Sequence, residues 1–293
     1  MADLIHWNVR GLKITNNDKL NKCCAILEQV GLNFILNLHE THLNSDSHIP
    51  RKFQKFSHMY HIVATHALND DKGAGILLFI NQTEEVLEKK ELFPGRLILV
   101  KTRNKSSGVV RNILSFYAKS HVHANEVKNY MCAIKQAILE VNLNNVVVIG
   151  DFNFVTSLLD RNSGNYTVSD NLYRHEWQKL EVSVGLLDSF RVTNPKRRVY
   201  SYTHTNGISR SRIDRIYLST DLQGKIISSS LEHNFSSDHK ILKLKMATDI
   251  ETGPGQWVFN NTFLSDDTFT KAINDIISDY KRHKTSFSGA KEL

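Results

Sequence analysis

The hydrophobic positions of this chain fall into short runs of strand length that recur between the N-terminus and residue 246. The runs occupy residues 4–7, 33–38, 61–65, 75–80, 96–102, 111–117, 146–150, 212–219 and 241–246. A continuous apolar run such as VVVIG at 146–150 predicts a strand that is buried on both faces. The alternating run ILKLKM at 241–246 instead predicts a strand with one face exposed.

Helical spacing of apolar residues appears between these runs. It predicts helices over 17–31, 125–141 and 171–186, with Gly31 as the C-cap of the first. Strands interspersed with helices indicate an α/β layered domain. Some connections between strands are too short for parallel crossovers, so we expect mixed sheets.

A domain boundary is predicted near residue 247. Residues 248–256, TDIETGPGQ, are polar and contain glycine, which is typical of a linker. The following segment, 265–283, places Phe269, Ile273, Ile276 and Tyr280 on one helical face. We therefore predict a domain over 1–247, followed at 248–293 by a linker and a helix that lead toward a further domain.

Composition and charge limit the possible functions. The chain has 293 residues, of which 41% are hydrophobic, and a net charge of +7. Residues 1–250 carry 32 basic and 24 acidic side chains, which favours a polyanionic partner. The start of the sequence shows no signal peptide and no run spans a membrane, so we expect a protein that is neither secreted nor membrane-bound. The three cysteines form no disulfide framework or zinc spacing.

Polar side chains cluster at the ends of the predicted strands. Three strands are followed by Asn8, by Glu40, and by the pair Asp151 and Asn153, which point the same way if the chain stays extended. Two other strands begin on such groups, Asp214 in one case and Asp238 with His239 in the other. If the second set runs antiparallel to the first, all these side chains meet at one edge. A helix cap would explain any one of them alone, but not the set.

This set of side chains suits phosphate ester hydrolysis. Oxygen ligands without a thiolate favour Mg²⁺, with Mn²⁺ as a substitute, over zinc. A histidine beside an aspartate has its tautomer and charge fixed by the carboxylate. A metal, an oriented histidine and a carboxylate that handles water are the groups needed for attack of water on a phosphate ester.

Basic residues in the final third of the predicted domain suggest contacts with nucleic acid. Lys196, Arg197 and Arg198 form the densest basic stretch and precede aromatic residues. Asn206-Gly207 is a strong hairpin signal between two strand-like runs. The hairpin would present Asn206, Ser209, Arg210 and Arg212 to a DNA groove. A solvated loop and a plain exposed hairpin are the alternatives.

The motifs together resemble the endonuclease–exonuclease–phosphatase family. They are WNVRGL at 7–12, LHETHL at 38–43, GDFN at 150–153, SRID at 211–214 and SDH at 237–239. Within that family they are most similar to the repair-type, apurinic-like endonuclease domain in the second open reading frame of non-LTR retrotransposons, the long interspersed elements. The resemblance implies a four-layered sandwich of two mixed sheets flanked by helices. It also implies that residues 248–293 lead toward a reverse transcriptase domain.

The resemblance also implies a role for each site residue. Glu40 would bind the metal with Asn8 nearby, and Asp238 would lie by the metal or support His239. Asp151, helped by Asn153, would orient or deprotonate the attacking water. His239 would meet the scissile phosphate while Asp214 holds its imidazole, and Tyr117 would contact the phosphate.

The function implied is a Mg²⁺-dependent endonuclease that nicks double-stranded target DNA. The 3′-hydroxyl that remains would prime reverse transcription of the element's RNA, in the nucleus, after synthesis in the cytoplasm. The alternatives are an abasic-site repair endonuclease, a phosphatase of the same fold, and a binding module without catalysis. Repair enzymes of the family usually carry Asp where this chain has Arg10, which argues against the first alternative.

Overall fold

The computed structural model describes residues 2–12, 17–29, 33–66, 68, 71, 73–120, 122–141, 143–233, 236–247 and 266–288. The chain divides into two compact units, Met1–Asp249 and Ile250–Leu293. The predicted linker at 248–256 lies outside the described residues. The proposed lead into a reverse transcriptase stays a prediction.

Two six-stranded sheets form the body of the first unit. In the order of the first sheet, the strands are β13 (Ile226–Glu232), β14 (Ile241–Met246), β1 (Asp3–Asn8), β2 (Phe34–His39), β4 (Ile76–Asn81) and β3 (Tyr60–Thr65). In the order of the second, they are β5 (Glu84–Phe93), β6 (Leu97–Asn104), β7 (Val110–Phe116), β8 (Val146–Asp151), β12 (Asp214–Ser219) and β9 (Leu186–Asp188). Each sheet has one parallel pair, β1 with β2 and β7 with β8, among antiparallel pairs. The predicted mixed sheets are confirmed.

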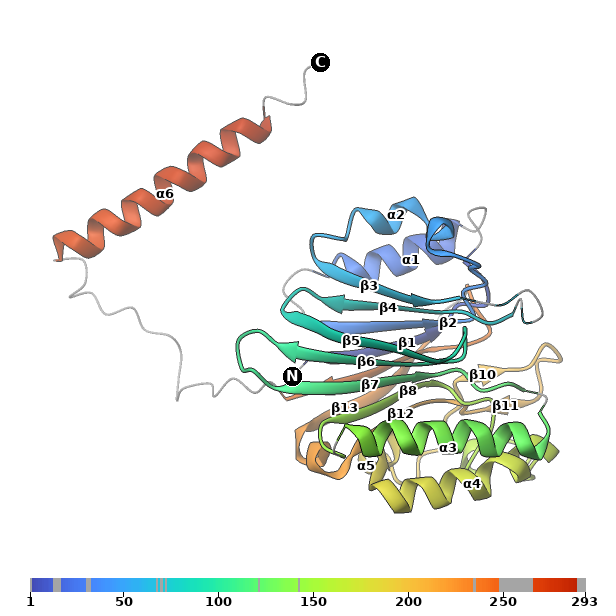
Figure 1. The fold of residues 1–293 in the computed structure, drawn as a ribbon. Helices are drawn as coiled ribbons and strands as arrows, with labels where there is room; N and C mark the ends of the chain where they lie inside the picture. Colours follow the sequence, from blue (N-terminus) through green and yellow to red (C-terminus); the bar gives the residue numbers. More distant parts are fainter. Residues whose placement is uncertain are drawn as a thin grey trace. The chain divides into compact units, whose positions relative to one another are not determined.

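Helices cover the outer faces of both sheets (Figure 1). α1 (Asn17–Leu27) and α2 (Arg51–Gln54) lie on the first sheet, and α3 (Ala124–Glu140) and α4 (Val168–Val184) on the second. The predicted four-layered α/β sandwich is thus confirmed. The remaining short elements are η1 (Asp46–His48), η2 (Leu158–Asp160), α5 (Ser189–Thr193), η3 (Thr220–Lys225) and the hairpin of β10 (Tyr202–Thr203) and β11 (Arg210–Ser211).

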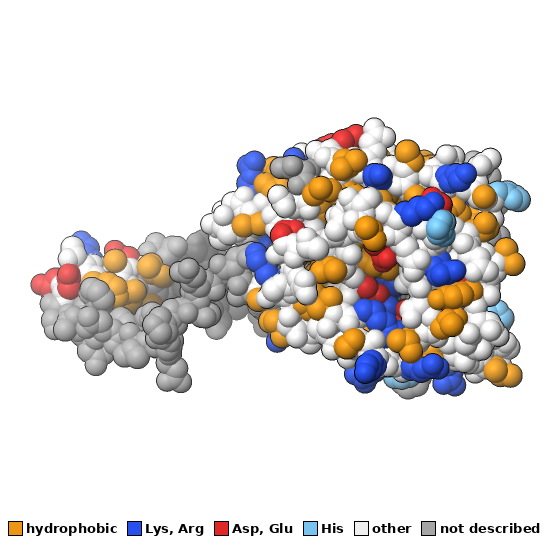
Figure 2. Space-filling model, turned by 90° about the horizontal axis from the view of Figure 1, so that it is seen from below, with side chains coloured by type: hydrophobic (Ala, Val, Ile, Leu, Met, Phe, Trp, Pro, Cys, Tyr) orange, Lys and Arg blue, Asp and Glu red, His pale blue; other side chains and the backbone are white. Residues whose placement is uncertain are grey.

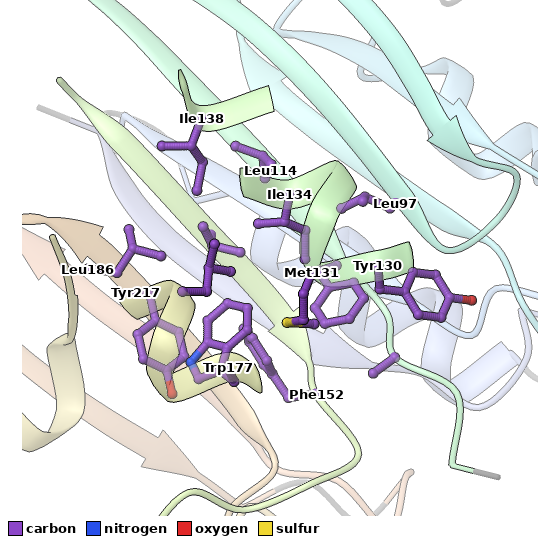
Figure 3. Close-up of a cluster of buried hydrophobic side chains, with 14 of the residues drawn as sticks. Leu97, Leu114, Tyr130, Met131, Ile134, Ile138, Phe152, Trp177, Leu186 and Tyr217 are labelled. Atoms are coloured by element: carbon purple, nitrogen blue, oxygen red, sulfur yellow. The ribbon is translucent and has the colours of Figure 1, made fainter. Parts of the chain in front are cut away.

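Three hydrophobic cores hold the four layers together. Along β6, Leu97 and Leu99 face the core under α3 and α4, whereas Ile98 and Val100 face the core between the sheets. This alternation explains why the strand is apolar throughout, because both of its faces are buried. Trp177 of α4 lies at the centre of the helix-side core (Figure 3), where its ring stacks on that of Phe116 with centroids 6.3 Å apart.

The helix of the second unit, α6, spans Asp267–Ser288. Asp266 accepts hydrogen bonds from the backbone N–H groups of Thr268 and Phe269, which satisfies donors at the start of the helix. Ile276 is 65% exposed, and Ile273 and Ile277 are also exposed, whereas the side chain of Tyr280 lies outside the described ones. None of the helices in the described residues is both long and apolar enough to cross a membrane.

Candidate active site

The candidate active site lies at one edge of the sandwich, where strands from both sheets end or begin. β1 and β2 run parallel, so Asn8 pairs with His39 at their carboxyl ends and Glu40 follows directly. β8 and β12 run antiparallel, which sets Asp151 opposite Asp214 in register. The predicted convergence of strand ends and starts is therefore present. An open pocket of about 580 Å³ lies at this edge.

Asp151 is buried at the floor of the pocket. Its carboxylate accepts a hydrogen bond from Asn8 Nδ2 at 2.8 Å and another from the backbone N–H of Asn153 at 2.9 Å. Burial and the charge of Asp214 raise the pKa of Asp151 to about 7. Asp151 can therefore gain or lose a proton near neutral pH, as a group that handles water must.

Gly150 lets β8 approach the first sheet closely. Its φ is +156°, and a Cβ at this position would lie 2.4 Å from the ring of His39 and 2.1 Å from the carbonyl oxygen of Phe116. Only glycine fits there, which gives the GDFN segment a steric explanation. Asn153, with φ at +52°, donates from Nδ2 to the Ala118 carbonyl at 2.7 Å, which fixes the turn after the strand.

Asp214 and His239 form a buried pair across from Asp151. His239 Nδ1 donates to Asp214 Oδ2 at 2.8 Å, while Nε2 lies 3.8 Å from Asp151 Oδ2. Burial lowers the pKa of His239, but the charge of Asp214 and its hydrogen bond more than offset this and raise it to about 9. Burial likewise raises the pKa of Asp214, but the charge of His239 and the hydrogen bonds from His239 and His6 together more than offset this, and the net pKa is below the ordinary value. The pair is thus an imidazolium held by a carboxylate.

Two tyrosines line the pocket near these groups. The guanidinium carbon of Arg96 lies over the ring of Tyr117, 4.2 Å from the centroid of that ring. Burial raises the pKa of Tyr117 well above its usual range, so its hydroxyl stays a donor. The ring of Tyr202 packs against that of His239, with centroids 4.8 Å apart, and limits how the imidazole can turn.

The comparison with known proteins decides the family. Residues 5–239 match the Endonuclease/Exonuclease/phosphatase family. The chain belongs to this family. The resemblance inferred from the motifs is confirmed.

A transposon protein is among the relatives of this endonuclease/exonuclease/phosphatase domain. It is the Transposon TX1 uncharacterized 149 kDa protein of Xenopus laevis, 28% identical over 208 residues. The match covers 70% of this chain and only 15% of the relative.

Solved structures with the same fold have different activities. The AP endonuclease LMAP from Leishmania major matches with a TM-score of 0.69 and 16% identity, over 84% of this chain and 88% of that one. The 3′ phosphatase NExo from Neisseria, bound to product DNA hairpin, matches with a TM-score of 0.65 and 18% identity, over 85% of this chain and 100% of that one. The endonuclease domain of TRAS1, a telomere-specific non-LTR retrotransposon, matches with a TM-score of 0.62 and 13% identity, over 85% of this chain and 100% of that one. At these identities the likeness establishes the fold alone.

The oxygen donors of this family domain fit a divalent cation. Asp151, Asp214 and His239 present ligand atoms within 4.8 Å of one another, but both oxygens of Asp214 are engaged by histidines. Glu40 lines the pocket; burial raises its pKa, but hydrogen bonds from His42 and Asn8 lower it further, and the net pKa is below the ordinary value. Glu40 is therefore ionised, and it is the better candidate to hold Mg²⁺ or Mn²⁺.

The other two residues expected near the metal, Asn8 and Asp238, also have partners within the chain, and Asn8 lies beside Glu40 as expected. Asn8 is buried, and it accepts the backbone N–H of Arg10 through Oδ1 while Nδ2 donates to Asp151. Its contacts therefore orient Asp151. Asp238 lines the pocket and accepts a hydrogen bond from Arg10 at 2.6 Å, so a cation of the chain itself already neutralises it.

One predicted DNA contact is wrong. Arg212 is only 1% exposed, and its guanidinium bridges Asp160 and Asp188. Its role is structural, because a buried guanidinium with two carboxylate partners has no access to DNA. The hairpin nevertheless borders the pocket, which His204 helps to line.

The other predicted contacts are exposed. They are Lys196, Arg197 and Arg198 before the hairpin, and Asn206, Ser209 and Arg210 on it. Asn206 Oδ1 accepts two backbone N–H groups of the turn, so that oxygen shapes the hairpin. In Figure 2, Lys and Arg side chains are spread over the face shown, with acidic ones among them.

Sequence reasoning missed a group of polar residues directly behind the site. His6, Asn37, His39 and Ser115 are each fully buried. These residues could have been recognised in the sequence as polar residues within otherwise apolar strands, as in LIHW and FILNLH. Arg10 and Tyr202 were also missed as members of the site.

Proposed function

We propose that this domain is a metal-dependent DNA endonuclease that nicks target DNA and leaves a 3′-hydroxyl to prime reverse transcription during retrotransposition. The observation that carries the proposal is the facing arrangement of Asp151 and His239 in one open pocket, with Asp214 buried behind the imidazole. One carboxylate there titrates near neutral pH, and one imidazole is held as a cation. Those are the two proton states that hydrolysis of a phosphodiester uses.

Each residue has a defined part in the reaction. Asp151 accepts a proton from water as the water oxygen bonds to phosphorus. The bond from phosphorus to the 3′-oxygen breaks, and that oxygen takes up a proton from solvent. Cationic His239 and the Tyr117 hydroxyl stabilise charge on the phosphoryl oxygens. A bound Mg²⁺ or Mn²⁺ would supply Lewis-acid stabilisation of the same charge.

DNA is the substrate that the rest of the domain favours. The pocket is open, the first 250 residues carry an excess of positive charge, and exposed basic side chains precede the hairpin beside the pocket. The transposon relative supports a role in an element that moves through chromosomal DNA. We therefore propose the nucleus as the site of action, and the element RNA and a reverse transcriptase domain as partners in the full-length protein.

Incubation with supercoiled plasmid tests this proposal. We expect open circles with Mg²⁺ or Mn²⁺ and none in excess EDTA. A DNA polymerase should extend the nicked ends directly, because they carry 3′-hydroxyls. Equal nicking in EDTA would reject the metal dependence. A strong preference for an abasic oligonucleotide over intact DNA would replace our proposal with repair.

A further inference from the structure

Four polar side chains occupy the space between the two sheets behind the active site, where the core is otherwise apolar. His6 comes from β1, Asn37 and His39 from β2, and Ser115 from β7. All four are 0% exposed. Polar groups buried this deeply cost free energy unless their hydrogen bonds are made, so their partners show what they hold in place.

The hydrogen bonds of this network run in one direction. The Asp151 backbone N–H donates to His39 Nδ1 at 3.2 Å, so the proton of the neutral His39 ring is on Nε2. His39 Nε2 then donates to Ser115 Oγ at 2.7 Å, and Ser115 donates to Asn37 Oδ1 at 2.8 Å. Burial lowers the pKa of His39 well below its usual range, which agrees with a neutral ring.

The same chain of bonds continues to Asp214. Asn37 Nδ2 can only donate, so His6 Nδ1, 3.0 Å away, accepts. The proton of His6 is therefore on Nε2, which donates to Asp214 Oδ1 at 3.0 Å. Asn37 Nδ2 also lies 3.1 Å from His39 Nε2, but both atoms carry protons in this arrangement and do not bond.

We propose that His6 is a positioning residue for catalysis, an inference that rests on the nuclease function proposed above. Asp214 has two carboxylate oxygens, of which Oδ2 orients His239. The terminal torsion of an aspartate is soft, so one hydrogen bond leaves the carboxylate free to turn. The Nε2–H of His6 fixes the other oxygen and thereby keeps Oδ2 aimed at His239.

Two substitutions of the same chemical kind separate positioning from mere filling of space. In His6→Gln the amide nitrogen can reach Asp214 as Nε2 of histidine does. In His6→Asn the side chain is shorter by one methylene, so its amide nitrogen cannot make this hydrogen bond. With plasmid and metal saturating, kcat should fall about 10–100-fold in His6→Asn, with KM for DNA within about 2-fold. His6→Gln should recover kcat to within about 3-fold of wild type. Equal kcat in both variants, high or low, would overturn the inference.

A remote variant controls for loss of stability alone. Thr102 lies in β6, five residues along the strand from Leu97. Its Oγ1 donates a hydrogen bond to the carboxylate of buried Glu84 at 3.1 Å. Thr102→Val removes a buried hydrogen bond without touching the site, so it should lower stability and leave kcat unchanged. A fall in kcat equal to that of His6→Asn would show that the effect is general.

A measurement on unmodified protein separates this inference from the nuclease proposal. In ¹⁵N-histidine-labelled wild-type protein at neutral pH, NMR should show His6 protonated on Nε2 alone and His239 protonated on both ring nitrogens, with downfield N–H signals for His6 Nε2 and His239 Nδ1. His6 protonated on Nδ1 would overturn the inference whether or not the protein nicks DNA. The expected signals from protein that cannot nick would instead reject the proposed function and leave the positioning geometry standing.

Discussion

Two clusters in this molecule each place two buried aspartates beside basic side chains, but they differ in how the charges are paired. Both draw on β12 or the residues just before it. The first consists of Asp160, Asp188 and Arg212, with Arg191 as a second cation on Asp160, and the second consists of Asp151, Asp214 and His239.

The Arg212 cluster is closed. Its guanidinium bonds Asp160 at 2.7 and 2.9 Å and Asp188 at 2.6 Å, so each carboxylate contacts the cation directly. Burial raises the pKa of Asp188, but the charge of Arg212 and its hydrogen bond, with smaller contributions from Arg215 and the Arg191 backbone, together more than offset this, and the net pKa is below the ordinary value. Asp188 therefore stays ionised near neutral pH.

The His239 cluster is open. His239 bonds Asp214 at 2.8 Å but lies 3.8 Å from Asp151, and Asp151 has its pKa raised to about 7 by burial and by Asp214. The comparison teaches that composition and burial do not define a catalytic cluster. A carboxylate left without a direct cation, beside an open pocket, is what distinguishes it.

The largest expected effect is on catalysis. His239→Ala and Asp151→Ala should each lower the nicking rate by a few orders of magnitude, because removing one member of a catalytic unit commonly disables the unit. Circular dichroism should show both variants folded. Near-normal turnover in either one would assign the chemistry to other residues.

Breaking the closed cluster should act on stability instead. Arg212→Met leaves Asp188 without its direct cation and Asp160 with Arg191 alone, and we expect a loss of about 3–5 kcal/mol in the free energy of unfolding. Urea unfolding measures this. Protein that stays folded should nick at a near-normal rate, and a catalytic defect at full stability would contradict the structural role.

The two clusters should also respond differently to pH. Asp151 must be unprotonated to accept a proton, so the nicking rate should fall as pH drops below about 7. His239 must be protonated, so the rate should fall again above about 9. A rate that is flat from pH 5.5 to 7 would remove Asp151 from the role of base.

The pKa of Asp188 in the folded protein is lowered, whereas that of Asp151 is raised. The effect of Asp188 on stability therefore falls in a more acidic pH range than the effect of Asp151 on activity. Its contribution to stability is present above the ordinary aspartate pKa of 3.8 and is lost only as pH falls through the lower folded value. Stability from the closed cluster should therefore stay constant across the range in which activity changes.

The smallest effects concern DNA contacts outside both clusters. Lys196→Ala should weaken DNA binding on all sequences alike and reduce the slope of log affinity against log salt concentration by about 1, because it removes one phosphate contact.

Replacement of residues 204–210 by a short Gly-Ser turn should keep nicking but redistribute the nick positions. An unchanged nick map would exclude the hairpin as a determinant of target choice.

Much of the fold was predictable because buried strands are apolar on both faces. The sheet strands missed were β5, β9 and β13. β5, EEVLEKKELF, lies at an edge of the second sheet, where charged side chains face water and hide the pattern. β13 lies at an edge of the first sheet and carries serines. Edge strands carry a weaker signal because only one neighbour and one face constrain them.

The site was predictable where residues follow or precede strands, as Asp151 and Asp214 do. Arg212 was not, because its sequence neighbours are basic, while its partners Asp160 and Asp188 are distant in sequence. The bond from His6 to Asp214 likewise spans 208 positions between two sheets. Only packing of the sheets brings such groups together.

The most direct test of the central claim is to measure both nicking and stability for Asp151→Asn at pH 8. Because burial penalises the ionised carboxylate, the neutral amide should keep the free energy of unfolding within about 1 kcal/mol of wild type. The nicking rate should nevertheless fall by about three orders of magnitude. A folded Asp151→Asn protein that nicks at the wild-type rate would contradict the claim that the open cluster carries the chemistry.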